Sequence, residues 1–131
     1  MKTLIIGIDC ATKPEKTGIA VGTFHPERST VESVDIGSQR HPIAHIIADQ
    51  INRTDRVLLA LDAPLGWPTA LGPTLHEHQA GQSIDVHPDL LFSRVTDKFV
   101  WEHTKKKPLD VGADRIARTA YAALSLLNTL R

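Results

Sequence analysis

The sequence predicts an α/β protein whose mixed sheet joins a three-stranded antiparallel meander to one parallel strand, with flanking helices. Two observations carry this prediction. The apolar runs at 4–8 and 57–61 are short and do not alternate with polar residues, which is typical of strands buried on both faces. A helical pattern lies between the two runs, so a crossover connection can lay the second strand parallel to the first.

The first half of the chain contains the elements of this sheet in order. Residues 3–9 and 18–24 are apolar and are separated by a polar turn, and residues 30–36 alternate as a half-exposed strand does. The short turns between these segments favour antiparallel pairing. Residues 42–53 begin with a proline suited to a first helical turn and carry isoleucines at helical spacing. They predict the helix that precedes the strand at 57–61.

The second half of the chain is less regular. Residues 63–90 are rich in Pro, Gly and His and predict a long functional loop with one short helix near 74–80. Residues 91–104 fit a strand or a helix equally well. From Asp110 or Gly112 onward, an alanine-rich apolar stripe predicts a helix of about 18 residues that runs almost to the last residue.

Length and composition limit the function classes. The 131 residues fit one domain, and 15 basic against 15 acidic residues give no global basic field for tight nonspecific binding to nucleic acid. The single cysteine, Cys10, excludes an intrachain disulfide and fits a reducing compartment. No apolar segment is long enough for a signal peptide or a membrane span. We therefore expect a cytoplasmic protein with no membrane partner.

Both apolar runs end in an aspartate, Asp9 after the first and Asp62 after the second. If the two strands are parallel neighbours, both carboxylates emerge at their carboxyl ends, where open α/β sheets bind ligands. Two adjacent carboxylates repel each other unless one is protonated or a cation lies between them. The pair therefore predicts a divalent cation site, although aspartate can also simply cap a turn at either position.

Three further groups of polar residues are candidates for the same site. Asp110 and Asp114 are four residues apart at the predicted helix start, where aspartate also serves as a cap. The cluster RVTDK contains Arg94, which could contact phosphate or lock the long loop through an Arg–Asp pair. Lys13 and Lys16, in the turn after the first strand, are predicted to bind substrate.

Two other features have simpler interpretations. Cys10, next to Asp9, is expected to be a small packed residue rather than a nucleophile. The basic run at 105–107 could meet a nucleic-acid backbone, although such runs more often form a solvated loop.

The segments GIDCAT and GIAVG, then LDAPLGWP, then RVTDK, together resemble the predicted RNase H-like nuclease family, which is catalogued as a domain of unknown function. The similar region runs from about residue 4 to residue 118. The resemblance implies a single RNase H-like domain over residues 1–131. By analogy with better-known RNase H-like nucleases, it also implies hydrolysis of phosphodiester bonds in nucleic acid with two metal ions, Mg²⁺ or Mn²⁺. Asp9 and Asp62 carry over as metal ligands.

The chain departs from this family in one respect. Family members continue after the alanine-rich helix into a further strand and a terminal helix with more acidic residues, whereas this sequence ends at Arg131. Either Asp110 and Asp114 on the last helix supply the missing carboxylates, or the fifth strand is absent and the site is incomplete. Such a chain could be inactive, or the exposed sheet edge could be completed in a homodimer. The catalytic and metal-binding residues predicted on this basis are Asp9, Asp62 and Asp114.

The main alternative is a noncatalytic binding or scaffold module with the same fold, in which Asp9 and Asp62 are only turn residues. A phosphate-binding relative of the actin and sugar-kinase superfold is a third interpretation, but it needs a second lobe for which 131 residues leave no room. The nuclease interpretation is preferred, and neutral charge does not distinguish a DNA substrate from an RNA substrate.

Overall fold

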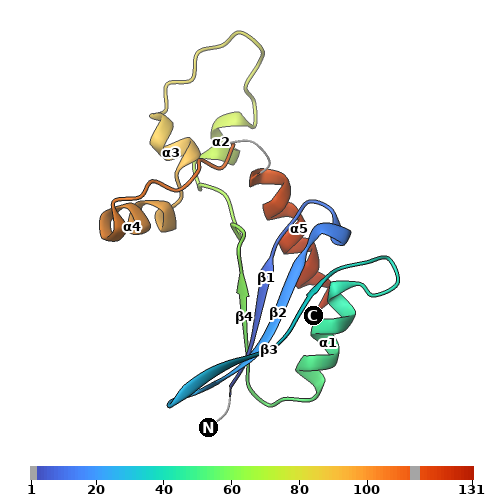
Figure 1. Cartoon of the computed structure of the whole chain (residues 1–131). Coiled ribbons are helices and arrows are strands. Elements are labelled where there is room, and N and C mark those ends of the chain that lie inside the picture. The colour runs from blue at the N-terminus through green and yellow to red at the C-terminus, as the bar shows by residue number, and fades with distance from the viewer. Residues whose placement is uncertain (1–2, 113–115) are drawn as a thin grey trace. The chain divides into compact units, whose positions relative to one another are not determined.

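The computed structural model describes residues 3–112 and 116–131. They form two compact units (Figure 1). The first unit contains Met1–Ala63 and Arg118–Arg131, and the second contains Pro64–Ala117. None of the helices in the described ranges has the length and apolarity needed to cross a membrane.

The first unit contains the predicted mixed sheet. Its strands are β1 (Thr3–Asp9), β2 (Gly18–His25), β3 (Arg28–Ile36) and β4 (Val57–Leu61). They lie in the order β3-β2-β1-β4. β2 is antiparallel to both β1 and β3, and β4 is parallel to β1. An antiparallel meander extended by one parallel strand is therefore confirmed.

The connections of this sheet also follow the sequence pattern. A short 3-10 helix, η1 (Pro14–Lys16), lies in the polar turn between β1 and β2. Helix α1 (Ile43–Asn52) lies between β3 and β4 and buries Ile43 and Ile47, as the isoleucine spacing predicts. Pro42 occupies the N-cap position of α1 rather than its first turn.

One face of the sheet forms the core of the first unit. Alternate residues of β1 point to this face, because side chains alternate along a strand. The side chains buried together there are Leu4, Ile6, Ile8, Ile19, Val21, Ile43 and Ile47. Leu126 and Leu130, near the end of α5 (Ile116–Thr129), pack against the same core. Both helices of the unit therefore contribute to one face of the sheet, and the odd-numbered residues of β1 belong to the other.

β4 is not buried on both faces, although its uninterrupted apolar sequence predicted that. Val57, Leu59 and Leu61 are half-buried, while Leu58 and Ala60 between them are exposed. The reason is that both helices of the unit pack on the core face, so on β4, at the edge of the sheet, only the side chains that point toward the core are covered. The apolar run correctly indicated a strand, but burial depends on strand order.

The second unit contains, among its described residues, the helices α2 (Leu71–Leu75), α3 (Pro88–Phe92) and α4 (Val95–Thr104). The short helix predicted near 74–80 is wrong in position, since α2 begins at Leu71. Pro73 lies in the first turn of α2, where a proline costs no backbone hydrogen bond. Residues 91–104, which fitted a strand or a helix, are helical over most of their length.

The described part of α5 begins at Ile116, and neither Asp110 nor Gly112, the two predicted starts, is itself helical. Asp110 lies in an irregular segment and Gly112 in a turn. The helix buries Ala120 and Ala123, two small residues of the predicted stripe. Asp114 lies outside the described residues.

Candidate functional site

Asp9 and Asp62 lie beside each other on neighbouring parallel strands, as the sequence predicts. The register aligns Ile8 with Leu61, and the amide of Asp62 donates a hydrogen bond to the carbonyl of Ile8 at 2.9 Å. The ladder therefore continues one residue beyond β4. It brings both aspartates, which are exposed, to the carboxyl ends of the two strands.

Both carboxylates belong to the sheet face opposite the core. Ile8 and Leu61 point toward the core, so the residues that follow them point to the other face. Neighbouring strands are about 4.8 Å apart, which is close enough for Asp9 and Asp62 to share one cation.

Cys10 lies close enough to both carboxylates to be affected by their charge. Burial raises the pKa of the Cys10 thiol, and the negative charges of Asp62 and Asp9 raise it further. The side chain packs against the core of the first unit, with Sγ 3.8 Å from the carbonyl oxygen of Ile8. Cys10 is therefore the small packed residue that we predicted, and it stays protonated at neutral pH.

Small residues surround the carboxylates on this face of the sheet. Asp9 faces Gly18 across the β1–β2 ladder, and a Cβ atom at Gly18 would lie 3.4 Å from Cβ of Asp9. One row further along, Gly7 lies between Ala20 and Ala60. In these rows the residues of β1 and β2 beside the pair are small, as is Ala60 of β4, while the larger Ile36 and Val34 follow on β3 next to Gly18 and Ala20. The sequence analysis did not identify this row. Gly7, Ala20 and Ala60 are far apart in the sequence, and only the strand register brings them together.

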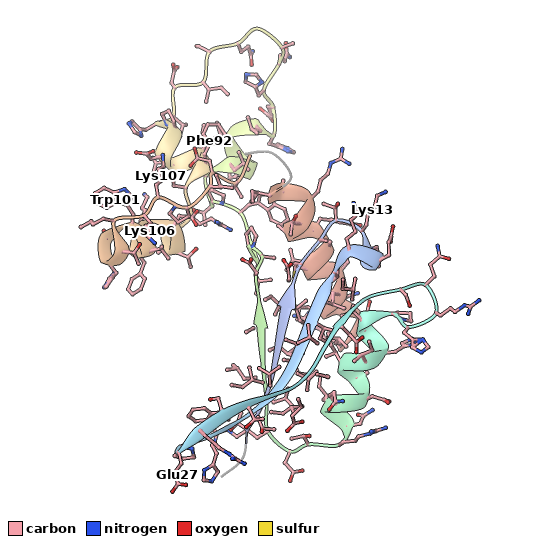
Figure 2. All side chains as sticks on the ribbon, in the orientation of Figure 1. Lys13, Glu27, Phe92, Trp101, Lys106 and Lys107 are labelled. Atoms are coloured by element: carbon pink, nitrogen blue, oxygen red, sulfur yellow. The ribbon has the colours of Figure 1, made fainter. Side chains whose placement is uncertain are left out.

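Lys13 and Lys16 lie in the turn that directly follows β1. The turn is closed by a hydrogen bond from the amide of Lys16 to the carbonyl of Lys13 at 2.9 Å, and both side chains are exposed. Figure 2 labels Lys13 at this end of the sheet. The two lysines are thus at the same end of β1 as Asp9, and their contact with substrate stays a prediction.

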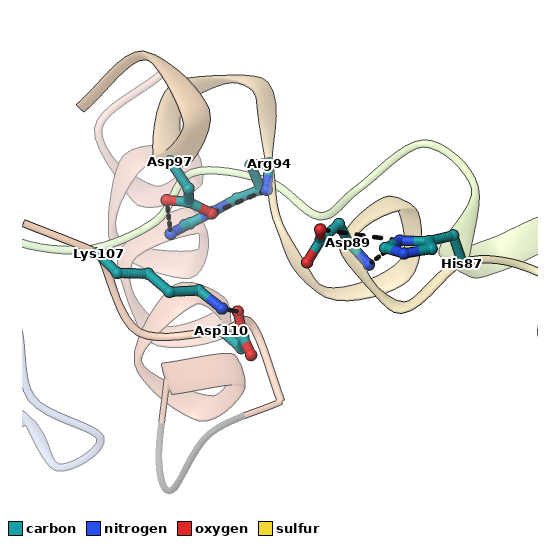
Figure 3. A network of polar contacts seen from close by, with 6 residues as sticks. All are labelled: His87, Asp89, Arg94, Asp97, Lys107 and Asp110. Carbon is teal, nitrogen blue, oxygen red and sulfur yellow. Dashed lines mark hydrogen bonds and ion pairs between the residues drawn. The ribbon is translucent and has the colours of Figure 1, made fainter. Parts of the chain in front are cut away.

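Arg94 belongs to the second unit, where Asp97 binds its guanidinium in two places (Figure 3). Nε and Nη2 of Arg94 donate to Oδ2 and Oδ1 of Asp97 at 2.8 and 2.6 Å, and the backbone amide of Arg94 also donates to Oδ2 at 2.8 Å. The sequence offered an Arg–Asp pair as the alternative to phosphate binding by Arg94. This pair is present at the start of α4. Substrate binding by Arg94 stays a prediction.

Asp97 is ionised in this pair. Its burial raises the pKa of the carboxyl group, but the hydrogen bonds and charge of Arg94 outweigh that effect and hold the pKa below its ordinary value. The side chains are only 17% and 10% exposed, so water screens the interaction weakly. The pair fixes the N-terminus of α4.

The structure does not add Asp110 or Asp114 to the aspartate pair. Asp114 lies outside the described residues. Asp110 belongs to the second unit, and its Oδ1 lies 3.9 Å from Nζ of Lys107 (Figure 3). Because Asp110 is not helical, it does not share a helix face with a residue four positions later. Over residues 3–112 and 116–131, no group of three or more His, Cys, Asp and Glu side chains could hold a metal ion.

The two aspartates are a donor set suited to one hydrated divalent cation. Mg²⁺ in proteins is commonly bound through one or two carboxylates together with substrate phosphates, and it keeps several waters. Asp9 and Asp62 supply these carboxylates on an exposed face. A two-metal site would need further carboxylates besides this pair.

Helix α4 and the residues after it carry an exposed aromatic and basic surface. Nζ of Lys105 lies 4.7 Å from the ring centroid of Trp101, and the rings of Phe99 and His103 stack with centroids 4.0 Å apart. The lysines at 106–107 follow (Figure 2). The sequence analysis identified only the lysines of this surface. The aromatic residues lie near them because one turn of the helix brings residues four positions apart together. Aromatic rings beside cations are typical of surfaces that bind single-stranded nucleic acid.

Comparisons with known proteins assign no family to the chain. No protein-family model matches it, and neither a curated protein nor a solved structure matches it. The resemblance to the predicted RNase H-like nuclease family therefore remains a prediction from the sequence motifs.

Proposed function

We propose that the chain is a metal-dependent phosphodiester hydrolase with an RNase H-like fold, and that it acts on nucleic acid at Asp9 and Asp62. The observation that carries this proposal is the β1–β4 register, which sets the two carboxylates side by side. Neighbouring carboxylates repel each other, and a divalent cation relieves that repulsion. The strand order of the sheet agrees with the fold that the motifs imply.

The residues around the pair suit a phosphodiester substrate. Asp9 and Asp62 would hold one Mg²⁺ or Mn²⁺, which when bound supplies Lewis-acid polarisation of a phosphoryl oxygen. The small residues Gly7 and Gly18 leave the neighbouring backbone accessible. Lys13, at the same end of β1, would attract the phosphate backbone without reading its sequence.

The second candidate is a noncatalytic binding module with the same fold. It is favoured by one observation, namely that the described residues contain no group of three or more metal-ligating side chains. In that case Asp9 and Asp62 only shape the chain where the two strands end, and neither binds a metal ion.

Calorimetric titration of the full chain with Mn²⁺ tests the site. We expect one ion to bind per chain, and we expect binding to be lost in both Asp9→Asn and Asp62→Asn. Asp35→Asn, which removes an exposed carboxylate from β3, is the matched control and should bind as the parent chain does.

Cleavage assays then separate the two candidates. We expect Mn²⁺-dependent cleavage of labelled DNA or RNA that Asp9→Asn abolishes. Binding of Mn²⁺ without cleavage of any single- or double-stranded substrate would contradict the hydrolase activity but leave the metal site in place. The absence of Mn²⁺ binding would contradict the proposed site itself.

A further inference from the structure

The two edges of the sheet differ in their protection against pairing with another chain. β3, at one edge, carries the charged residues Arg28, Glu32 and Asp35, and its register with β2 shifts between Val21 and Gly22. β4, at the other edge, has the sequence VLLAL, with no charge and no proline, and its register with β1 is regular. Edge charges and bulges prevent strands from pairing with other molecules. β4 has neither.

The outer edge of β4 offers backbone hydrogen-bonding groups at alternate residues. The carbonyl of Arg56 accepts from the amide of Leu4, and the amide of Asp62 donates to the carbonyl of Ile8, so the even-numbered positions bond toward β1. The odd-numbered residues of β4 therefore direct their N–H and C=O groups away from β1. No strand within the described part of the chain pairs with them.

We propose that β4 pairs antiparallel with β4 of a second copy of the chain, with Leu59 on the two-fold axis. The sheets of the two copies would then be continuous. In this register the facing pairs are Leu59 with Leu59, Leu58 with Ala60, Val57 with Leu61, and Arg56 with Asp62.

Three properties of the strand favour this occupant and this register. An antiparallel pair about a two-fold axis is self-complementary, so one sequence supplies both partners. Odd-numbered positions face one another, so their outward backbone groups form the ladder. Arg56, which also has an interaction partner within its own chain, faces Asp62 of the second copy at both ends of the strand, in a non-hydrogen-bonded position where side chains approach most closely. A shift of two residues would keep backbone bonds but lose both charge pairs.

The same register covers exposed apolar surface. Leu58, on the face opposite the core, is 54% exposed. It would pack beside Ala60 of the second copy, and removal of apolar surface from water stabilises an interface. The partner's Arg56 would lie next to Asp62, on the side away from Asp9. The dimer itself needs no metal ion and does not depend on the proposed function.

Engineered cysteines test the register directly. The Cα atoms of a non-hydrogen-bonded antiparallel pair are about 4.5 Å apart, which lies within the range that a disulfide spans. We expect chains with Leu58→Cys to crosslink to chains with Ala60→Cys under oxidation, in preference to either variant with itself. The parent chain, which contains only Cys10, gives the background. Equal crosslinking of Leu58→Cys with itself would contradict the register.

Sedimentation equilibrium tests the assembly. We expect the parent chain to dimerise, and we expect Leu58→Lys to weaken the dimer about tenfold or more, because a lysine on an edge strand opposes pairing. Val34→Lys is the matched control, since Val34 is 73% exposed but lies on β3. Arg56→Glu should weaken the dimer, and adding Asp62→Arg should restore it. A parent chain that is monomeric at every concentration tested would overturn the proposal.

Discussion

At the scale of single residues, Cys10 reports on the carboxylates beside it. Burial and the charges of Asp62 and Asp9 raise the pKa of its thiol above the ordinary value, so the reactive thiolate forms only at high pH. In Asp62→Asn one of these charges is absent, so we expect the pKa of Cys10 to fall and alkylation by iodoacetamide to begin at lower pH. The pH dependence of the alkylation rate measures this shift.

Asp35→Asn is the control for that experiment, since Asp35 lies on β3 and is not among the causes of the Cys10 shift. An unchanged pH profile in Asp62→Asn would mean that Asp62 is not close to the thiol in solution. It would also remove part of the support for an aspartate pair.

We predict that the stability of α4 depends on pH, because α4 is stabilised by the ionised form of Asp97. Its pKa is below the ordinary value in the folded chain, so the pair with Arg94 stabilises fully above the unfolded pKa of about 3.9 and loses this effect as pH falls through the folded value. At neutral pH, Asp97→Asn should lower the free energy of opening of α4 by about 2–3 kcal/mol. Native-state hydrogen exchange of the α4 amides measures it.

The exposed pair Arg53–Asp49, at 3.3 Å with side chains 72% and 68% exposed, is the control. Asp49→Asn should change stability by less than about 0.5 kcal/mol, because water screens exposed pairs. If Asp97→Asn lowered the stability no more than Asp49→Asn does, the buried Arg94–Asp97 pair would not fix the start of α4.

Sequence reasoning was more successful for Asp9 and Asp62 than for Arg94. The neighbouring positions of the two aspartates follow from strand order and direction, which apolar patterns predict. The environment of Arg94 depends on whether residues 94–97 begin a helix or a strand, and the sequence left that open. Only the helical turn brings Asp97 back to the guanidinium.

At the scale of elements, two glycines on the same sheet face have different roles. A Cβ atom at Gly22 would lie 2.6 Å from the carbonyl oxygen of Thr30, a backbone atom held in the β2–β3 ladder. Gly22→Ala should therefore lower the free energy of unfolding by about 1–3 kcal/mol. Urea denaturation monitored by circular dichroism measures the change.

Gly7→Ala is the matched substitution on β1, because the nearest atom to its Cβ would be the carbonyl oxygen of Ala20 at 3.9 Å. We expect it to be neutral or to stabilise by about 0.5 kcal/mol, through the smaller entropy of the unfolded chain. Equal destabilisation by both substitutions would contradict the close β2–β3 approach at Gly22.

The strands and α1 were predictable because their apolar periods are clear and their turns are short. The start of α2 was not, because this helix has no strong capping pattern in the sequence at its observed start, where Ala70 is the N-cap residue. The exposure of Leu58 was also not predictable from β4 alone. It depends on β4 being the last strand of the sheet, which is a property of the whole arrangement.

At the scale of the whole molecule, the length of 131 residues fits one domain, while the described residues group into two compact units. The difference arises from residues 63–90, which the sequence predicts as a loop. Together with the residues that follow, this segment forms short helices with contacts of their own. Pro- and Gly-rich composition indicated irregular backbone but could not indicate this grouping.

The proposed dimer should be independent of metal ions, because its ladder consists of backbone hydrogen bonds. Chelation with EDTA and the variant Asp9→Asn should both leave the dimer intact. Asp62→Asn should weaken it only severalfold, through the loss of two opposite-charge pairs. Sedimentation equilibrium of these samples measures the dissociation constants, and dissociation by EDTA would mean that a metal ion, rather than β4, joins the copies.

The central claim is that Asp9 and Asp62 together hold one divalent cation. A crystal structure of the full chain grown with Mn²⁺ tests it most directly, because the anomalous signal of manganese locates the ion. We predict one anomalous peak between the two carboxylates, on the sheet face opposite the core. Side chains that point apart with no peak between them, at a Mn²⁺ concentration that saturates binding in solution, would contradict the claim.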